Sequence, residues 1–241
     1  MKIFLDTADV PTILKHFETG LIDGITTNPS LIKKSGRDPL DVYRELMIAG
    51  VPDISMEVVE DMEFEARRLA AEFGEVCTIK VPCTPEGLKV CKQLSDDGVR
   101  VNVTLIFNAA QAILSAKAGA TYVSPFIGRL DDNSVAGLEV VRSISEVYRV
   151  QNVQTQILAA SIRDVYKVSR AFWNGAHVVT MPPKIFNGMY NHILTDKGLQ
   201  LFDEDWAEVQ HLKDQRDAFE PPLVAQQFNV NLKHGKDLDA F

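Results

Sequence analysis

Cysteine and long apolar runs are both scarce in this sequence of 241 residues. The three cysteines, Cys77, Cys83 and Cys91, are an odd number and show no CxxC spacing. Neither a disulfide framework nor a cysteine-ligated zinc site is therefore expected, and a reducing compartment suits this composition. No apolar run reaches the roughly 18 residues of a membrane span, and no signal-peptide pattern is present. We expect a cytoplasmic protein without a membrane partner.

Positive charge and nucleotide-binding motifs are also in short supply. Lysine and arginine number 25 against 33 aspartates and glutamates, which gives a net charge of −8 at pH 7. This balance argues against nucleic acid as a partner. Neither GxGxxG nor GxxxxGK[ST] occurs, and the five histidines show no metal-ligand spacing. The sequence therefore predicts no nucleotide, no metal and no other cofactor.

What the sequence does contain is a regular alternation of strand-like and helix-like segments. Eight short apolar segments, each followed by an amphipathic stretch, are expected to be strands: Lys2–Asp6, Asp23–Thr27, Ile54–Val58, Val76–Val81, Val99–Leu105, Ala120–Phe126, Thr155–Ala160 and His177–Met181. Strict alternation implies a parallel sheet, because parallel strands need crossover connections. We predict an α/β fold, a single (β/α)8 barrel over residues 1–195. A doubly wound open sheet is the main alternative.

Caps mark several ends of the predicted helices. Thr84 precedes Pro85 and offers an N-cap with proline at the first helical position. Asn108 with Gln111, and Ser161 with Asp164, have the spacing of capping boxes. Glycines are expected to end helices at four positions before strands: Gly50, Gly98, Gly119 and Gly175.

The C-terminal segment, residues 196–241, has a different character. Leu199–Lys213 is expected to form an amphipathic helix, Pro221-Pro222 interrupts the chain, and Leu223–Phe241 is mixed in composition. So few residues cannot build a second core. This helical extension would either pack on its own barrel or cross to a neighbouring subunit, and the sequence leaves both possibilities open.

Polar side chains recur at period two in the predicted strands. Strand residues alternate between the helices and the barrel interior, so apolar residues on the helix side place polar ones inside. Ile25, for example, faces the helices, and Leu158 and Leu105 are expected to do the same. The residues then expected inside, toward the carboxyl ends of the strands, are Phe4, Asp6, Thr26, Asn28, Ser55, Glu57, Thr78, Lys80, Asn102, Thr104, Ser124, Phe126, Ala159 and Ser161. Barrel active sites are built at that end.

Lys80 is the most informative of these residues, because it interrupts the apolar run Val76–Val81. Asp6 and Glu57 are available as acidic partners, and a buried ion pair or triad is one interpretation. The other is a Schiff-base lysine, since burial disfavours the ammonium form and the neutral amine is a nucleophile. Such chemistry needs a base at a substrate hydroxyl and a proton shuttle, which two carboxylates in different surroundings can divide.

Further polar residues complete the expected site. Thr104 could hold a shuttle water, and Asn28 and Asn102 could bind sugar hydroxyls. Arg129 and Arg163 follow the sixth and seventh strands, close to Ser161. The two arginines are either solvated loop charges or, with Ser161, a phosphate clamp, because arginine binds phosphate in a forked geometry.

At this point the sequence resembles the transaldolase family, and specifically its small single-domain branch, which includes the fructose-6-phosphate aldolases. The resemblance covers residues 1 to about 215. Six motifs carry it: Phe4-Leu5-Asp6-Thr7-Ala8-Asp9, Gly24-Ile25-Thr26-Thr27-Asn28-Pro29-Ser30, Ile79-Lys80-Val81-Pro82, Asn102-Val103-Thr104-Leu105-Ile106-Phe107, Ser124-Pro125-Phe126-Ile127-Gly128-Arg129 and Ala159-Ala160-Ser161-Ile162-Arg163.

The resemblance implies a metal-free class I mechanism with a Schiff base on Lys80. It implies that Asp6 is the acid/base for carbon–carbon cleavage, and that Glu57 works with Thr104 and a water as proton shuttle. The substrate-binding residues it implies are Asn28, Asn102, Ser124, Arg129, Ser161 and Arg163, with the last three on the phosphate. We expect Thr26 and Phe126 to bind substrate as well, which makes twelve site residues in all.

The two activities of the family differ at a few positions. Transaldolases carry glutamate and phenylalanine where the releasing aldolases carry glutamine and tyrosine, and here Glu57 and Phe126 match the transaldolases. Arg163 also matches, since the aldolases tend to carry lysine. The implied reaction moves dihydroxyacetone from sedoheptulose 7-phosphate to glyceraldehyde 3-phosphate, giving erythrose 4-phosphate and fructose 6-phosphate in the pentose phosphate pathway. A dihydroxyacetone-releasing aldolase and a catalytically silent sugar-phosphate-binding barrel are the alternatives.

Small family members tend to assemble as decamers of two stacked pentamers through C-terminal helices. By resemblance we expect a homo-oligomer, pentamer or decamer. The segment after about residue 215 has no counterpart in those members, which leaves the stoichiometry open.

Overall fold

The structure of the chain, a computed structural model, describes residues 1–219. The chain divides into a first unit, Met1–Tyr190, and a second unit that begins at Asn191. The division falls slightly before the boundary that we expected after residue 195. Pro221-Pro222 and Leu223–Phe241, on which the sequence left two possibilities open, lie outside the described residues.

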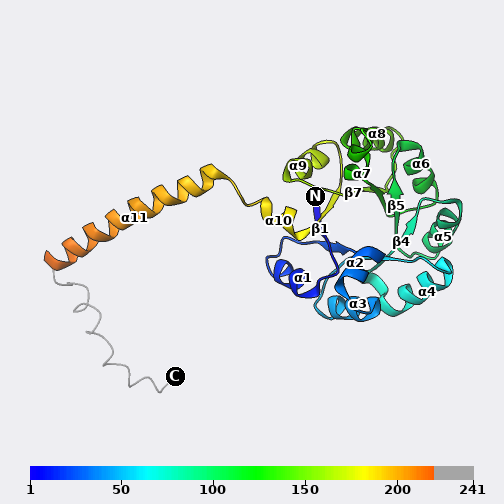
Figure 1. Cartoon of the computed structure of the whole chain (residues 1–241), viewed down its shortest axis with the longest axis horizontal. Coiled ribbons are helices and arrows are strands. Elements are labelled where there is room, and N and C mark those ends of the chain that lie inside the picture. Colours follow the sequence, from blue (N-terminus) through cyan, green and yellow to red (C-terminus); the bar gives the residue numbers. More distant parts are fainter. Residues whose placement is uncertain (220–241) are drawn as a thin grey trace, which may run out of the picture. The chain divides into compact units, whose positions relative to one another are not determined.

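The first unit is a closed barrel of eight parallel strands in sequence order (Figure 1). The strands are β1 Lys2–Asp6, β2 Gly24–Thr26, β3 Ile54–Glu57, β4 Cys77–Pro82, β5 Val101–Ile106, β6 Tyr122–Pro125, β7 Gln156–Ala159 and β8 Val178–Met181. β8 pairs in parallel with β1, which closes the sheet on itself. The predicted (β/α)8 barrel is confirmed, and the open-sheet alternative is excluded.

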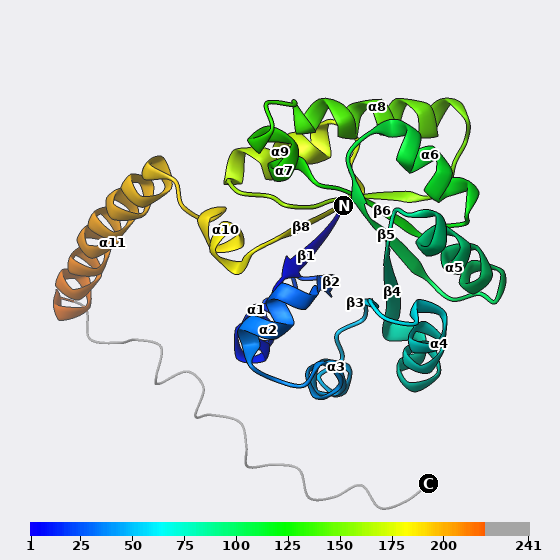
Figure 2. The same ribbon diagram turned by 45° about the vertical axis from the view of Figure 1, so that its right-hand side comes forward.

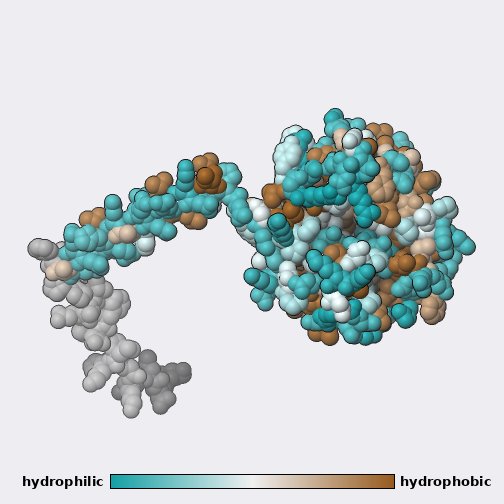
Figure 3. All heavy atoms as spheres, viewed as in Figure 1, coloured by the Kyte–Doolittle hydropathy of each residue, from teal (hydrophilic) through white to brown (hydrophobic). Residues whose placement is uncertain are grey.

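Helices surround the barrel, as the turned view in Figure 2 also shows. They are α1 Val10–Phe17, α2 Pro29–Ser35, α3 Pro39–Ile48, α4 Met62–Phe73, α5 Pro85–Asp96, α6 Ala109–Lys117, α7 Ile127–Asp132, α8 Gly137–Val150, α9 Val165–Trp173 and α10 Pro183–Gly188, with a short 3-10 turn at Gly74–Val76. Hydrophilic and hydrophobic residues are interspersed over the face of the barrel unit seen in Figure 3.

Two of the three predicted N-caps are confirmed. The Thr84 side chain accepts from the Gly87 N–H at the start of α5, and Asn108 accepts from the Gln111 N–H at the start of α6. The third prediction is wrong: Asp164, not Ser161, caps α9. Ser161 lies in a left-handed backbone conformation, with φ of +59°, and not in the extended conformation that is typical of an N-cap. The four predicted helix-ending glycines all have φ between +79° and +96°.

The barrel has two apolar layers. The outer layer, between strands and helices, contains residues such as Ile25, Met56 and Val103. The inner layer is a buried cluster formed by Phe4, Tyr122, Leu158, Ala160 and Val178. A side chain at Gly24 would meet the Phe4 ring, because an added Cβ would lie 2.7 Å from it. Glycine in β2 therefore makes room for an aromatic ring that fills the barrel.

The predicted alternation was wrong in two strands. In β7, Leu158 faces the interior and Ala159 packs in the outer layer, because a barrel interior needs bulky side chains to fill it. In β5, the register against β6 shifts between Val103 and Ile106, and Leu105 has φ of +60°. This irregularity ends the alternation at Thr104, and Ile106 takes the core position expected for Leu105.

The second unit consists, within the described residues, of the helix α11, Ile193–Phe219. It extends beyond the predicted Leu199–Lys213 at both ends. Among residues 1–219, no helix combines the length and the apolar character that crossing a membrane requires.

Candidate active site

Lys80 occupies the interior face of β4, where its side chain is only 6% exposed. Its Nζ lies 2.9 Å from Glu57 Oε2 and donates to the Thr27 carbonyl, also at 2.9 Å. The register sets the first contact, because Glu57 of β3 and Lys80 of β4 are directly paired. The lysine is thus held between a carboxylate and a backbone dipole, as a buried cation requires.

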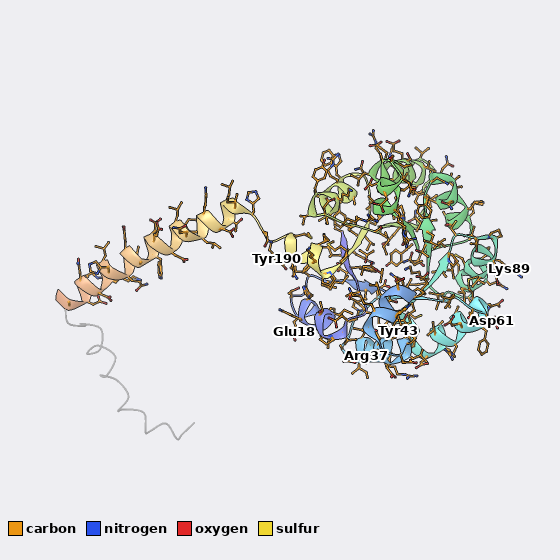
Figure 4. All side chains as sticks on the ribbon, in the orientation of Figure 1. Glu18, Arg37, Tyr43, Asp61, Lys89 and Tyr190 are labelled. Atoms are coloured by element: carbon orange, nitrogen blue, oxygen red, sulfur yellow. The ribbon has the colours of Figure 1, made fainter. Side chains whose placement is uncertain are left out.

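The Thr27 carbonyl is itself held in place from outside the barrel. The Thr27 hydroxyl donates to the Ser55 carbonyl at 2.9 Å and lies 3.0 Å from the Tyr43 hydroxyl. Because the single Thr27 proton goes to Ser55, Tyr43 is the donor in the second contact. Burial raises the pKa of Tyr43 to about 12, so it stays a neutral donor. Figure 4 shows Tyr43 on α3.

Asp6 ends β1 and lines the same cavity as Lys80. Thr26 of β2 donates its hydroxyl proton to Asp6 Oδ1 at 2.8 Å. Asp6 keeps a partly exposed edge toward the cavity, yet protein surrounds most of the carboxyl, and this burial raises its pKa above the usual range. The charge of Lys80 and the Thr26 hydrogen bond oppose the rise, and the charge of Glu57 adds to it. A buried carboxyl of this kind is suited to proton transfer.

The cavity has a volume of about 120 Å³ and opens at the carboxyl ends of the strands. Eight of the twelve predicted site residues line it: Asp6, Thr26, Asn28, Lys80, Ser124, Phe126, Arg129 and Ser161. Asn28 also caps α2, where its Oδ1 accepts from the Leu31 N–H at 3.0 Å. Its amide nitrogen is therefore the atom available to a substrate.

Asn102 lies beside Lys80 in the sheet but does not line the cavity. Its amide donates to Ser55 Oγ at 3.2 Å, and its Oδ1 accepts from Ser124 Oγ at 2.7 Å. All three residues are buried. Asn102 thus fixes Ser124, which does reach the cavity.

Thr104 is a buried residue whose hydroxyl has no hydrogen-bond partner among the described residues. It sits where the β5 register shifts, one residue before the left-handed Leu105. A buried hydroxyl left without a protein partner is costly, and an internal water is the usual solution. The local geometry therefore fits a water next to Thr104.

Ser161 reaches the cavity because of its left-handed backbone. It directly follows Ala160, which faces the interior, so regular alternation would turn Ser161 away. Its carbonyl accepts from the Gly128 N–H at 3.0 Å. A Cβ at Gly128 would lie 2.3 Å from the Ser161 carbonyl oxygen and 2.6 Å from Arg163 Nε, so only glycine lets α7 pack this closely against both residues.

The two arginines differ in their surroundings. Arg129 lines the cavity, with its guanidinium carbon 4.9 Å from the centre of the Phe126 ring. Arg163 does not line it, is half exposed, and pairs through both terminal nitrogens with Asp132. Arg163 thus lies at the edge of the site, next to Gly128 and Ser161.

Thr180 of β8 is a cavity residue that the sequence analysis missed. It is buried, and its Oγ1 lies 2.6 Å from Thr26 Oγ1. The signal was present, because Val179 and Met181 pack in the outer layer and alternation then places Thr180 inside.

Another hollow of the barrel unit shares no residue with this cavity. A larger groove of about 870 Å³, lined by Ile113, Val147 and Tyr148 among others, includes none of the predicted site residues. Across residues 1–219, no three histidine, cysteine or acidic side chains converge in a way that would hold a metal ion.

Comparison with known proteins gives a consistent result. The model of the family described as Transaldolase/Fructose-6-phosphate aldolase matches residues 3–229, further along the chain than the resemblance that we had placed at about residue 215. A probable transaldolase of Cereibacter sphaeroides (strain ATCC 17025) is 51% identical over 213 residues, which cover 87% of this chain and 97% of the relative. A probable transaldolase of Paracoccus denitrificans is 52% identical over 213 residues, covering 87% and 98%.

The probable transaldolase of Erythrobacter litoralis is similarly close, with 51% identity over 212 residues that cover 86% of this chain and 96% of the relative. A family match over most of the length and relatives at about half identity agree with the lysine-centred barrel described above. The chain therefore belongs to the transaldolase/fructose-6-phosphate aldolase family.

Proposed function

We propose that this protein is a transaldolase that transfers a dihydroxyacetone unit through a Schiff base on Lys80. The donor would be sedoheptulose 7-phosphate and the acceptor glyceraldehyde 3-phosphate, with erythrose 4-phosphate and fructose 6-phosphate as products. The observation that carries the proposal is the buried Lys80 amine, 2.9 Å from Glu57, in one cavity with Asp6.

The first step is attack of the neutral Lys80 amine on the ketone carbon of the sugar. Glu57 is placed to take a proton from Nζ, because the two groups are 2.9 Å apart. The carbinolamine that forms then loses water, which needs a proton delivered to its hydroxyl. A water held by the unpartnered Thr104 hydroxyl would relay this proton from Glu57.

The second step is cleavage between the third and fourth carbons. The Asp6 carboxylate takes the proton of the C4 hydroxyl, the C3–C4 bonding electrons move into the iminium, and an aldehyde leaves. The enamine that remains on Lys80 then attacks the acceptor aldehyde, and Asp6 returns its proton to the new C4 oxygen. The raised pKa of Asp6 suits a group that both accepts and returns a proton.

The phosphate of either sugar would lie toward Arg129, Ser161 and Arg163. Arg129 and Ser161 already line the cavity, and the close packing of Gly128 against Ser161 keeps the two residues next to each other. Arg163 would contribute its charge from the edge, with Asp132 holding the guanidinium in place.

Borohydride trapping tests the proposal. The wild-type enzyme is incubated with fructose 6-phosphate and reduced, and peptides are read by mass spectrometry. We expect a three-carbon adduct on Lys80 that declines when erythrose 4-phosphate is added, because the acceptor removes the unit. No adduct on Lys80 would rule out the Schiff-base enzyme, including the aldolase alternative, and would leave a silent binding barrel.

Phe126→Tyr is expected to shift the enzyme from transfer toward release of free dihydroxyacetone. Phe126 lines the cavity between Phe107 and Arg129, so a tyrosine hydroxyl would place a proton donor near the enamine. The release-to-transfer ratio should rise by roughly tenfold or more, toward the 10²–10⁴-fold that a well-positioned acid contributes. Phe107→Tyr is the matched control, and an unchanged ratio in Phe126→Tyr would contradict the assigned role.

The homo-oligomer expected from the family resemblance stays a prediction. α11 carries exposed apolar residues at helical spacing, namely Leu199, Phe202, Trp206 and Val209, as a helix that packs on another surface does. Light scattering on the full chain would measure the mass directly, and a monomer mass would contradict the prediction.

A further inference from the structure

Thr180 and Thr26 approach Asp6 from the two strands that flank β1. β8 and β2 both pair with β1, and Asp6 ends the strand between them. Thr180 is 2% exposed and Thr26 is 3% exposed, so neither hydroxyl can rely on bulk water for a partner. The hydroxyl oxygens are 2.6 Å apart, a short hydrogen bond.

The direction of each hydrogen bond follows from the number of protons. An ionised carboxylate only accepts, so the 2.8 Å contact between Thr26 Oγ1 and Asp6 Oδ1 uses the single proton of Thr26. Thr26 Oγ1 can then only accept from Thr180, which must donate. The three groups form a one-way chain from Thr180 through Thr26 to Asp6.

We propose that Thr180 is a positioning residue for Asp6 and acts through Thr26. The Thr180 hydroxyl donates a hydrogen bond to the Thr26 oxygen. This contact keeps the Thr26 hydroxyl turned toward Asp6 Oδ1. That oxygen is then engaged, and Oδ2 is left to take the substrate proton. The proposal deepens the function given above, because it rests on Asp6 as the acid/base.

This chain of hydrogen bonds, here called the relay, also affects the pKa of Asp6. Burial raises the pKa of Asp6, and the hydrogen bond from Thr26 lowers it. Weakening that bond leaves the carboxylate less stabilised, so the pKa of Asp6 should rise further. A base works in its unprotonated form, so activity falls when Asp6 becomes protonated at acid pH. This part of the pH profile, the acid limb, should therefore move to higher pH.

Other charged groups near Asp6 would stay as they are when Thr180 is changed. The charges of Lys80 on β4 and Glu57 on β3 both affect the pKa of Asp6, and Arg129 of α7 lines the same cavity. On the other side, Asp9 and Lys34 line an adjoining cleft with Asp6. Thr180 is hydrogen-bonded to none of these five groups, so a shift in its variants reports on the relay.

The test compares Thr180→Val, which keeps the shape and removes the hydroxyl, with Thr180→Ser, which keeps the hydroxyl. The Asp6 carboxyl is titrated by ¹³C NMR in each variant, and kcat/KM for transfer is measured against pH. We expect both the Asp6 titration and the acid limb to move up by about half a pH unit or more in the valine variant, roughly a threefold effect below the limb. The serine variant should match the wild type.

Two further measurements separate the relay from packing and from the proposed function. Borohydride trapping on Lys80 should be unchanged in Thr180→Val, because Lys80 and Glu57 are untouched. In a Thr26→Val background, Thr180→Val should cause no additional shift, since the link is already lost. An unshifted Asp6 titration in Thr180→Val, or an equal shift in Thr180→Ser, would overturn the proposal. A shifted titration without any Lys80 adduct would leave the relay standing and remove the transaldolase.

Discussion

Replacing Lys80 by methionine is expected to abolish transfer, with a fall on the order of 10⁴-fold or more in kcat/KM. A thioether cannot form an imine, so the mechanism loses its covalent step rather than one of its aids. Methionine is unbranched and of similar length, so it can occupy the buried position on β4 without a large cavity. Transfer rates and borohydride trapping with fructose 6-phosphate would both show the loss.

The same substitution removes one member of a buried ion pair, and its effect on stability must be separated from its effect on chemistry. The Glu57 side chain is 17% exposed, so its carboxylate would remain largely buried without a counter-charge. Breaking such a pair costs about 3–5 kcal/mol of unfolding free energy. Combining Lys80→Met with Glu57→Gln should restore most of the stability, measured by urea unfolding, and none of the activity. An adduct or measurable transfer in either variant would contradict the role of Lys80.

The barrel could be predicted from the sequence because the signals for its strands and helices are local and are repeated along the chain. Each strand ends near a glycine, proline or polar cap, and period two holds over most of them. Lys80, Glu57 and Asp6 were predicted to meet because alternation places all three inside the barrel at one end. In the structure Glu57 lies directly opposite Lys80 in the register, and Asp6 lines the same cavity as Lys80.

The sequence failed where the backbone leaves the regular strand. Leu105 and Ser161 both have positive φ, and no glycine marks either position. Without that signal, alternation was carried one residue too far in β5, and Ser161 was interpreted as a helix cap. Leu158 was misplaced for a different reason: a leucine fits either side of a barrel strand, and only the filling of the interior by Phe4 and Tyr122 decides between them.

Side-chain partners were also beyond the sequence. Arg163 was predicted to be a phosphate ligand, and the structure shows its guanidinium paired with Asp132, a residue 31 positions away. Asn102 was predicted to bind a sugar hydroxyl, and its side chain donates to Ser55 and accepts from Ser124 without lining the cavity. Both contacts depend on where distant loops and strands meet, which neither composition nor periodicity contains.

Asp6→Asn is expected to separate the two halves of the reaction. The amide keeps the shape of the side chain and can still accept from Thr26, but it cannot take the proton of the C4 hydroxyl. Schiff-base formation depends on Lys80 and Glu57 and should continue. Transfer should fall by about 10²–10⁴-fold, the usual contribution of a positioned acid or base.

The adduct itself should report which step has stopped. In the wild-type enzyme, fructose 6-phosphate is cleaved on Lys80, and reduction traps a three-carbon unit. In Asp6→Asn the intact six-carbon phosphate should accumulate on the same lysine, because the C3–C4 bond is not broken. Mass spectrometry of the Lys80 peptide distinguishes the two masses without any rate measurement.

The pH dependence provides a second, independent consequence. Since burial raises the pKa of Asp6, the acid limb of wild-type kcat/KM should lie above about 3.9, the value of an ordinary aspartate. Asp9→Asn is the matched control, because Asp9 is an exposed carboxylate three residues along that accepts from the Thr12 hydroxyl. It should leave the limb and the adduct as in the wild type. A three-carbon adduct formed at the wild-type rate in Asp6→Asn would mean that another group breaks the carbon–carbon bond, and the division of labour between Lys80 and Asp6 would then have to be abandoned.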